Sequence, residues 1–160
     1  MSFSRGRTIL TAALAALAVA VVGGLMTDLG PWYQGLEKPS WQPPGIWFGP
    51  VWTMLYALTA MAAALAWWSS DSYQSRMNVL IWFLFNAVLN VTWSLLFFRF
   101  QRPDWALSEW FLFWFSIVIM IWICWKRNRT AAMLLIPYLA WVTFAGILNA
   151  EIVKLNGPFG

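Results

Sequence analysis

The sequence has no histidine, and Cys124 is its only cysteine. Without histidine there can be no Ser-His-Asp or Cys-His catalytic group and no histidine-ligated haem. A zinc site built from histidine or paired cysteines is excluded for the same reason, and so is an intramolecular disulfide. We therefore expect no metal site and no cofactor that the protein requires.

Charged residues are also scarce. They make up 10% of the 160 residues, and 61% of the residues are hydrophobic, whereas about a quarter of an average soluble domain is charged. So few charges cannot cover a water-soluble globule, and the composition indicates an integral membrane protein with the lipid bilayer as a partner. The net charge of +4 is not gathered into a basic stripe, which argues against nucleic-acid binding.

Five apolar runs lie at residues 8–29, 45–68, 77–98, 104–125 and 130–153, each long enough to cross about 30 Å of hydrocarbon as a helix. They predict an all-α fold: a multi-pass bundle of five transmembrane helices with a proline- and tryptophan-rich loop between the first two. No internal repeat or low-complexity segment divides the chain, so we expect a single domain over residues 1–160. The sequence does not say which membrane holds it.

The first run could instead be a secretory signal, because Arg5 and Arg7 precede it and residues 18–20 resemble a cleavage site. Hydrophobicity continues beyond that point through Met26, with no polar region before the cut. We therefore favour a retained helix over processing of residues 1–29.

Four prolines between residues 31 and 44 predict a non-helical connector between the first two runs. Proline fixes its own φ and pushes the preceding residue out of the helical region. The connector also carries Trp32, Tyr33 and Trp41, whose amphipathic rings suit the edge of a bilayer. A connector that is stiff and rich in aromatic residues does more than join two helices, and we interpret residues 30–44 as a lid over a pocket.

Polar and indole side chains gather in the half of the bundle beneath this lid. Asn86, Asn90 and Trp93 share one helix face, and Trp52 and Trp141 lie at a depth that is reachable from the same side. The asparagines should face the interior, where they either bond other helices or line a site; the sequence leaves both open. An indole-walled pocket with a few N–H donors suits a large, flat, mostly apolar molecule rather than an ion.

Other features of the runs have plainer interpretations. Asp28 and Glu151 fall near run ends, so no carboxylate relay crosses the membrane and ion pumping is disfavoured. Pro137 predicts a kink in the last run, and Trp114 is interpreted as lipid-facing bulk. Tryptophans near run ends are interpreted as interface anchors: Trp47, Trp67, Trp68, Trp105, Trp122 and Trp125.

Small residues recur at every fourth position in the first two runs and predict smooth ridges for close helix packing. Such ridges are common in membrane helices, and they support one alternative hypothesis, a purely structural protein that binds other helices. The two ridges are Ala12, Ala16, Ala20 and Gly24, and Gly45, Gly49, Thr53 and Ala57.

Three segments resemble motifs of the TspO/translocator protein family, also called tryptophan-rich sensory proteins. They are WYQGLEKPSWQPP at residues 32–44, LNVTW at 89–93 and PYLAW at 137–141. The resemblance covers nearly the whole chain, in order and at the family's spacing. It implies a five-helix membrane bundle, often homodimeric, that binds tetrapyrroles such as protoporphyrin IX and, in animal members, cholesterol and benzodiazepine-type drugs.

By that resemblance the expected function is a receptor or carrier, with a porphyrin or another flat apolar molecule as its ligand. It implies seven ligand-binding residues, to which we add Trp41 of the lid; the eight are Tyr33, Trp41, Trp52, Asn90, Trp93, Trp141, Ala145 and Leu148. No catalytic residue is expected for a receptor. Some bacterial members are reported to degrade protoporphyrin in light, so an alternative is a photo-oxidative enzyme that uses Trp52 and Trp141.

The chain departs from the animal family's cholesterol motif, since Ala150 and Glu151 stand where a tyrosine is needed before Lys154. This argues against tight sterol binding. Orientation stays open. Six lysines and arginines on the side of the N-terminus against four on the lid side favour a cytoplasmic N-terminus, whereas animal members have the lid side in the cytosol.

Overall fold

A computed structural model describes residues 5–159; the first four residues and the last, which complete the expected domain 1–160, lie outside the described part. Within residues 5–159 the regular structure is helical, without a strand. The elements in chain order are α1 (Arg5–Met26), α2 (Pro31–Gly35), the 3₁₀ turn η1 (Gly45–Trp47), α3 (Phe48–Trp68), α4 (Tyr73–Ser94), the π-helical turn η2 (Leu95–Arg99), α5 (Pro103–Trp125), α6 (Arg129–Leu134) and α7 (Ile136–Asn156).

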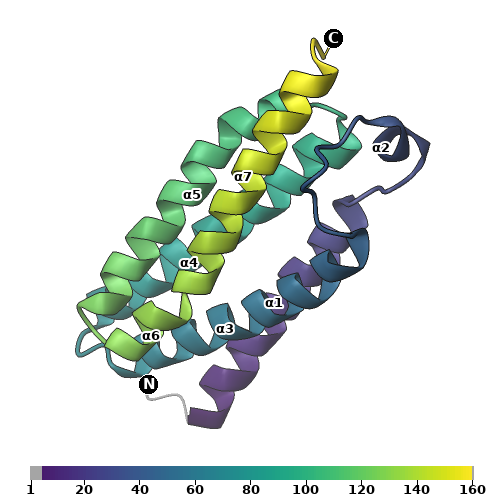
Figure 1. Ribbon diagram of the computed structural model, residues 1–160. Coiled ribbons are helices and arrows are strands. Elements are labelled where there is room, and N and C mark those ends of the chain that lie inside the picture. Colours follow the sequence, from purple (N-terminus) through teal and green to yellow (C-terminus); the bar gives the residue numbers. More distant parts are fainter. Residues whose placement is uncertain (1–4, 160) are drawn as a thin grey trace.

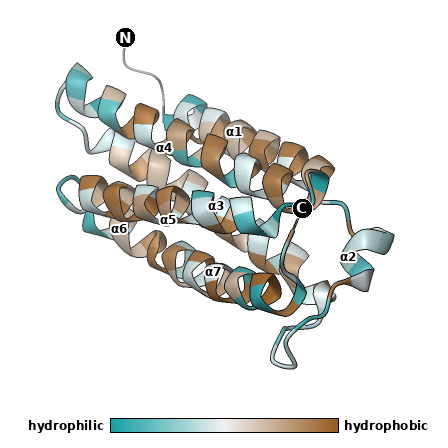
Figure 2. Cartoon of the chain, turned by 90° about the horizontal axis from the view of Figure 1, so that it is seen from above, coloured by the Kyte–Doolittle hydropathy of each residue, from teal (hydrophilic) through white to brown (hydrophobic). Residues whose placement is uncertain are grey.

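Five helical stretches are long and apolar enough to cross a membrane, as the five runs predict. They are Arg5–Met26, Gly45–Trp68, Tyr73–Arg99, Pro103–Trp125 and Arg129–Asn156. The long helices lie side by side with the lid at one end of the bundle (Figure 1). Brown, hydrophobic residues cover much of the outside of these helices (Figure 2), as expected for a surface that faces lipid.

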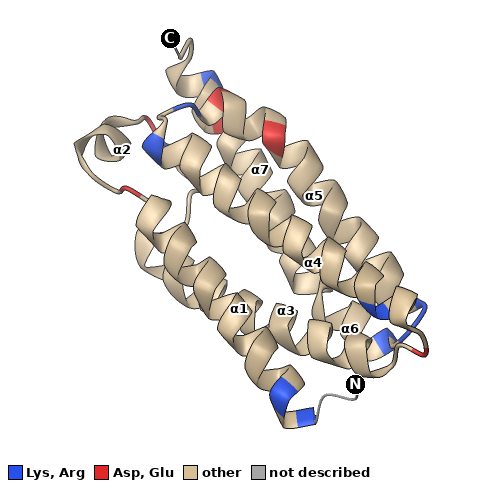
Figure 3. Ribbon diagram, turned by 180° about the vertical axis from the view of Figure 1, so that it is seen from behind, with Lys and Arg blue, Asp and Glu red and all other residues tan. Residues whose placement is uncertain are grey.

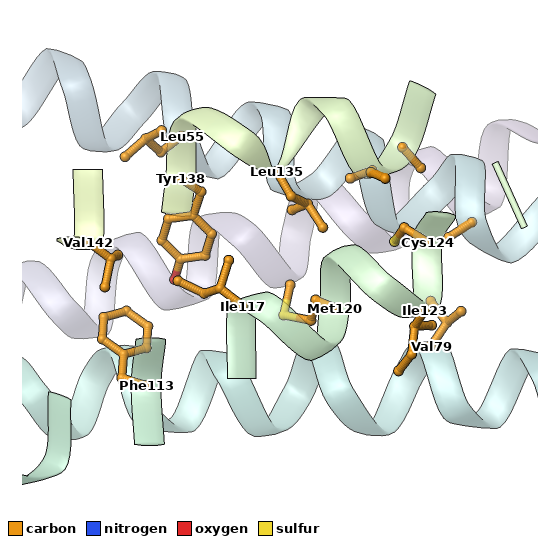
Figure 4. Packing of buried hydrophobic residues seen from close by; sticks show 14 of the residues in the cluster. Leu55, Val79, Phe113, Ile117, Met120, Ile123, Cys124, Leu135, Tyr138 and Val142 are labelled. Atoms are coloured by element: carbon orange, nitrogen blue, oxygen red, sulfur yellow. The ribbon is translucent and has the colours of Figure 1, made fainter. Parts of the chain in front are cut away.

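The helices form a ring in the order α1, α3, α6 with α7, α5 and α4, since each of these neighbours packs against the next. Side chains of α5 supply much of the core, in which Ile117 and Met120 are fully buried against Leu135 (Figure 4). Helix α1 is the peripheral member, because Gly23 is its one buried residue within the described part of the chain. The bundle is therefore tight around α5 and loose around α1.

Proline starts helices in this fold more than it interrupts them. The prediction of a wholly non-helical connector is wrong, because Pro31 opens the short helix α2. Pro103 starts α5 in the same way. A proline in the first turn loses no hydrogen bond, since its N–H would have no partner there. Pro137 likewise lies in the first turn of α7, so the predicted kink is a break at Leu135 between α6 and α7.

Charged residues are confined largely to the two ends of the bundle (Figure 3). At the end opposite the lid, four cations lie over indole rings: Arg5 over Trp68, Arg76 over Trp67, Lys126 over Trp122 and Arg129 over Trp125. An indole with a cation on its face suits the boundary between lipid and water. These rings occupy the helix ends at which interface anchors are expected.

Candidate functional site

A hydrogen-bonded layer crosses the middle of the bundle and ties four helices together. The Tyr138 hydroxyl donates to Asn86 Oδ1 (3.0 Å) and accepts from Asn90 Nδ2 (3.5 Å). The Tyr56 hydroxyl donates to Asn90 Oδ1 (2.9 Å), and Asn86 Nδ2 donates to Ser116 Oγ (2.8 Å). We call Tyr56, Asn86, Asn90, Ser116 and Tyr138 the polar layer.

Both asparagines of the polar layer are 3% exposed, so they face the interior as predicted. Their amide groups bond to side chains of α3, α5 and α7. Buried amides without partners are costly in hydrocarbon, so each bond contributes to holding the helices in register. The packing role that the sequence left open is therefore present, and Asn90 still borders open space, as shown below.

The lid, residues 30–44, is organised around Lys38. Its ammonium group donates to the carbonyl oxygens of Tyr33 (2.7 Å), Leu36 (3.1 Å) and Gln34 (3.4 Å) and lies 4.6 Å from the Tyr33 ring centroid. These carbonyls belong to or follow the last turn of α2, where a cation is favourable. One lysine therefore caps the short helix and fixes the lid around Tyr33.

A pair of hydrogen bonds fastens the lid to the far end of the chain. The Glu37 backbone N–H donates to Asn156 Oδ1 (2.8 Å), and Asn156 Nδ2 donates back to the Glu37 carbonyl (2.9 Å). Asn156 is the last residue of α7. We call this pair the clasp. Because both of its bonds are exposed, it can open without disturbing the core.

Aromatic pairs press the lid onto the bundle. Trp32 meets Phe97 edge-on, with centroids 6.2 Å apart, and the Tyr33 ring lies 5.5 Å from that of Phe98. Trp41 meets Phe144 at 5.9 Å while 46% of its surface stays exposed. Such pairs stabilise beyond their buried area, so the lid is closed and held by rings.

The rings beneath the lid link the predicted site residues to one another. Trp141 lies between Phe48 (5.6 Å) and Phe144 (5.4 Å). Trp52 stacks on Tyr56 at 5.5 Å and meets Tyr138 edge-on at 6.3 Å. Trp52 thus rests directly on the polar layer, because Tyr56 and Tyr138 are both partners of Asn90.

The remaining predicted residues lie toward η2 and the end of α7. Trp93 stacks on Phe97 (5.2 Å), and Leu148 is buried in the same cluster, against which Trp32 and Tyr33 also pack. Ala145 is half-buried one turn after Trp141. The structure therefore places seven of the eight predicted residues in the lid half of the bundle, in two adjoining groups around Trp141 and Phe97. The eighth, Asn90, lies in the polar layer at the boundary of that half.

Besides the carboxylate oxygens of Glu109 in α5, two polar atoms in the lid half are buried without a hydrogen-bond partner among the described residues. They are the Trp141 indole Nε1 and the Gln42 Oε1. The amide nitrogen of Gln42 donates weakly to the Tyr33 hydroxyl (3.5 Å). Burial raises the pKa of Tyr33, and the bond to Gln42 lowers it by less. Buried polar groups are normally satisfied, so this donor and this acceptor mark a place where a ligand can complete the bonding.

A cavity lies on the other side of the polar layer, away from the lid. Its volume is about 560 Å³, and its walls come from α1, α3 and α4, with Tyr138 of α7 at the polar layer. We call it the alanine cavity after its commonest lining residue. Of the eight predicted ligand-binding residues, Asn90 is the one that borders it.

The sequence profile of the TspO/MBR family matches residues 11–155. The chain belongs to the TspO/MBR family. It is 38% identical over 158 residues to the tryptophan-rich protein TspO of Chlorobaculum tepidum, covering 94% of this chain and 98% of that one. It is 36% identical over 145 residues to the TspO of Archaeoglobus fulgidus, covering 89% and 93%. With the Homo sapiens translocator protein it shares 34% over 119 residues, covering 74% and 70%.

Membership of the TspO/MBR family confirms the resemblance carried by the three motifs. Together with the five candidate spans, it establishes a multi-pass integral membrane protein.

One interior residue of this TspO/MBR family member escaped the sequence argument. Both carboxylate oxygens of Glu109 are buried without a partner among the described residues, inside the α5 span and one helical turn before the buried Phe113. The prediction that no carboxylate relay crosses the membrane rested on Asp28 and Glu151, which lie near run ends. An ionisable residue within a span is by itself a signal of function, and that signal finds Glu109.

The interpretation of Trp114 as lipid-facing bulk is wrong. Its indole N–H donates to Thr143 Oγ1 (2.8 Å), and the neighbouring Trp110 donates to the Val142 carbonyl (2.8 Å). Both bonds join α5 to α7. A Cβ added at Gly146 would overlap the Trp110 ring, so this glycine is what lets the two helices approach. Hydropathy alone does not distinguish an indole that bonds a neighbouring helix from one that faces lipid.

The predicted small-residue ridges are also only partly packed. In α1 the buried glycine is Gly23, not Gly24, and it lies against the Tyr56 hydroxyl. In η1 and α3 all four residues of the second ridge are exposed: Gly45, Gly49, Thr53 and Ala57. The second ridge therefore remains available on the outside of the bundle.

Proposed function

We propose that this protein binds a tetrapyrrole such as protoporphyrin IX beneath its lid, as a membrane receptor or carrier. The observation that carries the proposal is the buried Trp141 Nε1–H, which has no hydrogen-bond partner within residues 5–159 and is set among aromatic rings that the lid covers. An aromatic wall with one free donor suits a broad flat ligand that has acceptor groups at its edge. No cofactor is needed, because the porphyrin is the ligand.

Separate parts of the site have separate roles in this proposal. Trp52 and Trp141 offer ring faces, and Tyr33, Trp41, Trp93, Ala145 and Leu148 shape the space around them. A tetrapyrrole also carries carboxylates, and Lys38 supplies a positive charge that contacts backbone carbonyls and the Tyr33 ring. The ring pairs Trp41–Phe144 and Phe48–Trp141 interlock beneath the lid. Entry of the ligand therefore requires the lid to lift and these pairs to part.

The test is a titration of protoporphyrin IX against tryptophan fluorescence in detergent. Trp141→Phe keeps an aromatic face and loses the N–H donor, so affinity should fall about fivefold, the value of one hydrogen bond. Trp122→Phe is the matched control, because Trp122 is 58% exposed at the opposite end of the bundle. Equal affinity in the wild type and in Trp52→Phe and Trp141→Phe would show that the ligand binds elsewhere.

The alternative is an enzyme that degrades the bound porphyrin in light, with dioxygen as the oxidant. One arrangement favours it: Trp52 is in ring contact with both Tyr56 and Tyr138, so an electron withdrawn from the indole can be replaced from a neighbouring phenol. Illumination of the complex, followed by porphyrin absorbance, tests it. The enzyme predicts faster loss than for free dye in micelles, and slower loss in Trp52→Phe at equal occupancy; loss at the rate of free dye excludes it.

We also propose that the protein forms a homodimer through the exposed ridge of α3, where Gly49, Thr53 and Ala57 would allow close approach of a second copy. Gly49→Leu should shift the detergent-solubilised protein to the monomer without changing its porphyrin affinity. If this variant stays a dimer, the interface lies on another face.

A further inference from the structure

The alanine cavity has the depth of one membrane leaflet. On α4 its lining runs from Val79 to Asn90, a rise of about 16 Å, or half of a hydrocarbon core about 30 Å thick. Its inner end is closed by the hydroxyl of Tyr138 and the amide of Asn90, and its outer end is reached by Thr8 and Trp67. A space of these dimensions matches an extended acyl chain that enters from the end opposite the lid.

The cavity opens sideways between α1 and α4. Leu80 and Leu84 of α4 line it and are 40% and 52% exposed. Ala15 and Ala18 line it from α1 and are exposed as well. Because this rim lies within the spanning segments, it faces lipid rather than water. Water is a poor occupant of an apolar space in hydrocarbon, so a lipid chain is the natural one.

The outer end of the cavity carries positive charge. The Arg76 guanidinium lies 5.9 Å from the ring of Trp67, a lining residue, and the Arg5 guanidinium lies 5.9 Å from the adjacent Trp68. Arg76 Nε and Thr8 Oγ1 are buried without a partner among the described residues. These unpaired groups would suit an anion at the cavity mouth.

Carboxylates of the described chain do not neutralise these arginines. The two ion pairs found within residues 5–159, Arg102–Asp104 and Lys154–Glu151, both lie at the lid end. Asp71, in the turn before α4, is exposed and belongs to neither of these two pairs. The cavity thus combines a long apolar body with an uncompensated cationic mouth.

We propose that the alanine cavity binds an anionic phospholipid, with one acyl chain between α1, α3 and α4 and the phosphate against Arg76 and Arg5. The site is separate from the proposed porphyrin site, because the polar layer and the Trp52 ring lie between them. The positive charge at the cavity mouth and the length of the cavity select the lipid. The lipid proposal is therefore tested independently of the porphyrin proposal.

The first experiment measures lipid retention by native mass spectrometry. The whole protein is incubated in detergent with equal amounts of phosphatidylglycerol and phosphatidylcholine of identical chains. Wild type should retain phosphatidylglycerol preferentially, and Arg76→Gln should lower that preference about fivefold, the value of one arginine near an anionic lipid. Lys126→Gln is the matched control, because Lys126 also lies over an indole at this end, 3.6 Å from the Trp122 centroid, but outside the cavity.

The second experiment fills the cavity. Ala87→Phe and Ala63→Phe each place a ring in it from opposite walls and should abolish retention of the lipid, whereas Ala150→Phe, at an exposed position on α7, should leave retention unchanged. Thermal unfolding reports whether each variant folds. If neither filling variant folds, the experiment uses phosphatidylglycerol with brominated acyl chains, which quench nearby tryptophans. This lipid should quench the tryptophan fluorescence of wild type more strongly than the tryptophan fluorescence of Trp67→Phe.

Four outcomes would overturn the proposal. They are equal retention of the two lipids by wild type, equal effects of Arg76→Gln and Lys126→Gln, retention by a folded Ala87→Phe variant, and equal quenching of the wild type and Trp67→Phe. Protoporphyrin IX that displaces the lipid from wild type and fails to bind Ala87→Phe would also overturn it, since the cavity would then hold the flat ligand. Trp141→Phe should leave lipid retention unchanged, so failure of the porphyrin proposal is recognised separately.

Discussion

The polar layer divides the bundle into two halves that are built from different side chains. The lid half is filled by interlocking rings, with Trp52, Trp141 and Phe97 at its centre. The other half is walled by alanines on α1 and α3 and encloses a cavity of about 560 Å³. Within residues 5–159, buried polar atoms without a hydrogen-bond partner occur in both halves, whereas this open volume lies only in the second. Recognition chemistry and free space are thus separate properties, and a site cannot be located from either one alone.

The largest expected effect comes from overfilling the ring-packed half. Gly146→Ala places a methyl group on the Trp110 indole, whose N–H is fixed to the Val142 carbonyl, so the ring cannot turn away without losing that bond. We expect a loss of about 3 kcal/mol, the upper range for overpacking, measured by thermal unfolding in detergent. Gly24→Ala is the control, because an added Cβ there meets nothing within 4 Å. Equal melting temperatures for the two variants would mean that α5 and α7 pack loosely.

The next effect concerns the boundary between the halves. Tyr138→Phe removes the hydroxyl shared by the two asparagines and leaves Asn86 Oδ1 without that donor. The expected cost is about 2 kcal/mol, as for a buried polar group left unsatisfied. Tyr56→Phe should cost less, because its hydroxyl bonds to one asparagine only. Double variants with Asn86→Leu, measured in the same unfolding assay, should show non-additive losses for Tyr138→Phe; strict additivity would argue against a connected layer.

A third, opposite effect is expected at Glu109. A buried carboxylate with no partner lowers stability, so Glu109→Leu should raise the free energy of unfolding by about 1 kcal/mol. Glu151→Leu, at the end of α7, removes an exposed ion pair with Lys154 and should change stability little. A destabilised Glu109→Leu would show that the carboxylate is bonded in the folded protein. A stabilised variant with altered porphyrin affinity would identify Glu109 as a residue kept for the ligand.

The smallest effect on stability should come from the clasp. Asn156→Ala removes two exposed hydrogen bonds that hold the lid, and it should cost the whole fold about 1 kcal/mol or less. Its main consequence is local: amide hydrogen exchange should accelerate in residues 30–44, while exchange around the alanine cavity stays as in wild type. Uniform acceleration across both halves would show that lid and bundle open together.

Much of this architecture could be predicted from the sequence, because membrane spans require continuous apolar runs. The second span, Gly45–Trp68, has the predicted bounds, and Asn86 and Asn90 face the interior as their polarity demands. Residue type decides such features. The features that could not be predicted depend on which neighbouring helix a residue contacts. They include whether Trp114 bonds Thr143 or faces lipid, and whether Gly23 or Gly24 meets α3. The two alternatives in each case differ by a rotation of the helix about its own axis, and the hydropathy of the sequence does not define this rotation.

The same limit applies to the candidate site. The family resemblance gave the eight residues, and depth along the helices placed Trp52, Asn90, Trp93 and Trp141 in the half beneath the lid. They gave no indication of the alanine cavity, since its lining residues are mostly alanine and other common apolar types and are spread over four helices. A cavity is defined by what neighbouring helices leave unfilled, and this depends on interhelical distance rather than on any local pattern.

The polar layer has a thermodynamic consequence for both halves. Tyr56 and Tyr138 touch Trp52 on one side and line the alanine cavity on the other. If a lipid in the cavity changes the affinity for a ligand under the lid by some factor, the ligand must change the affinity for the lipid by the same factor. Titrating each molecule in the presence of the other measures that factor twice, and any disagreement between the two values would reveal a third state of the protein.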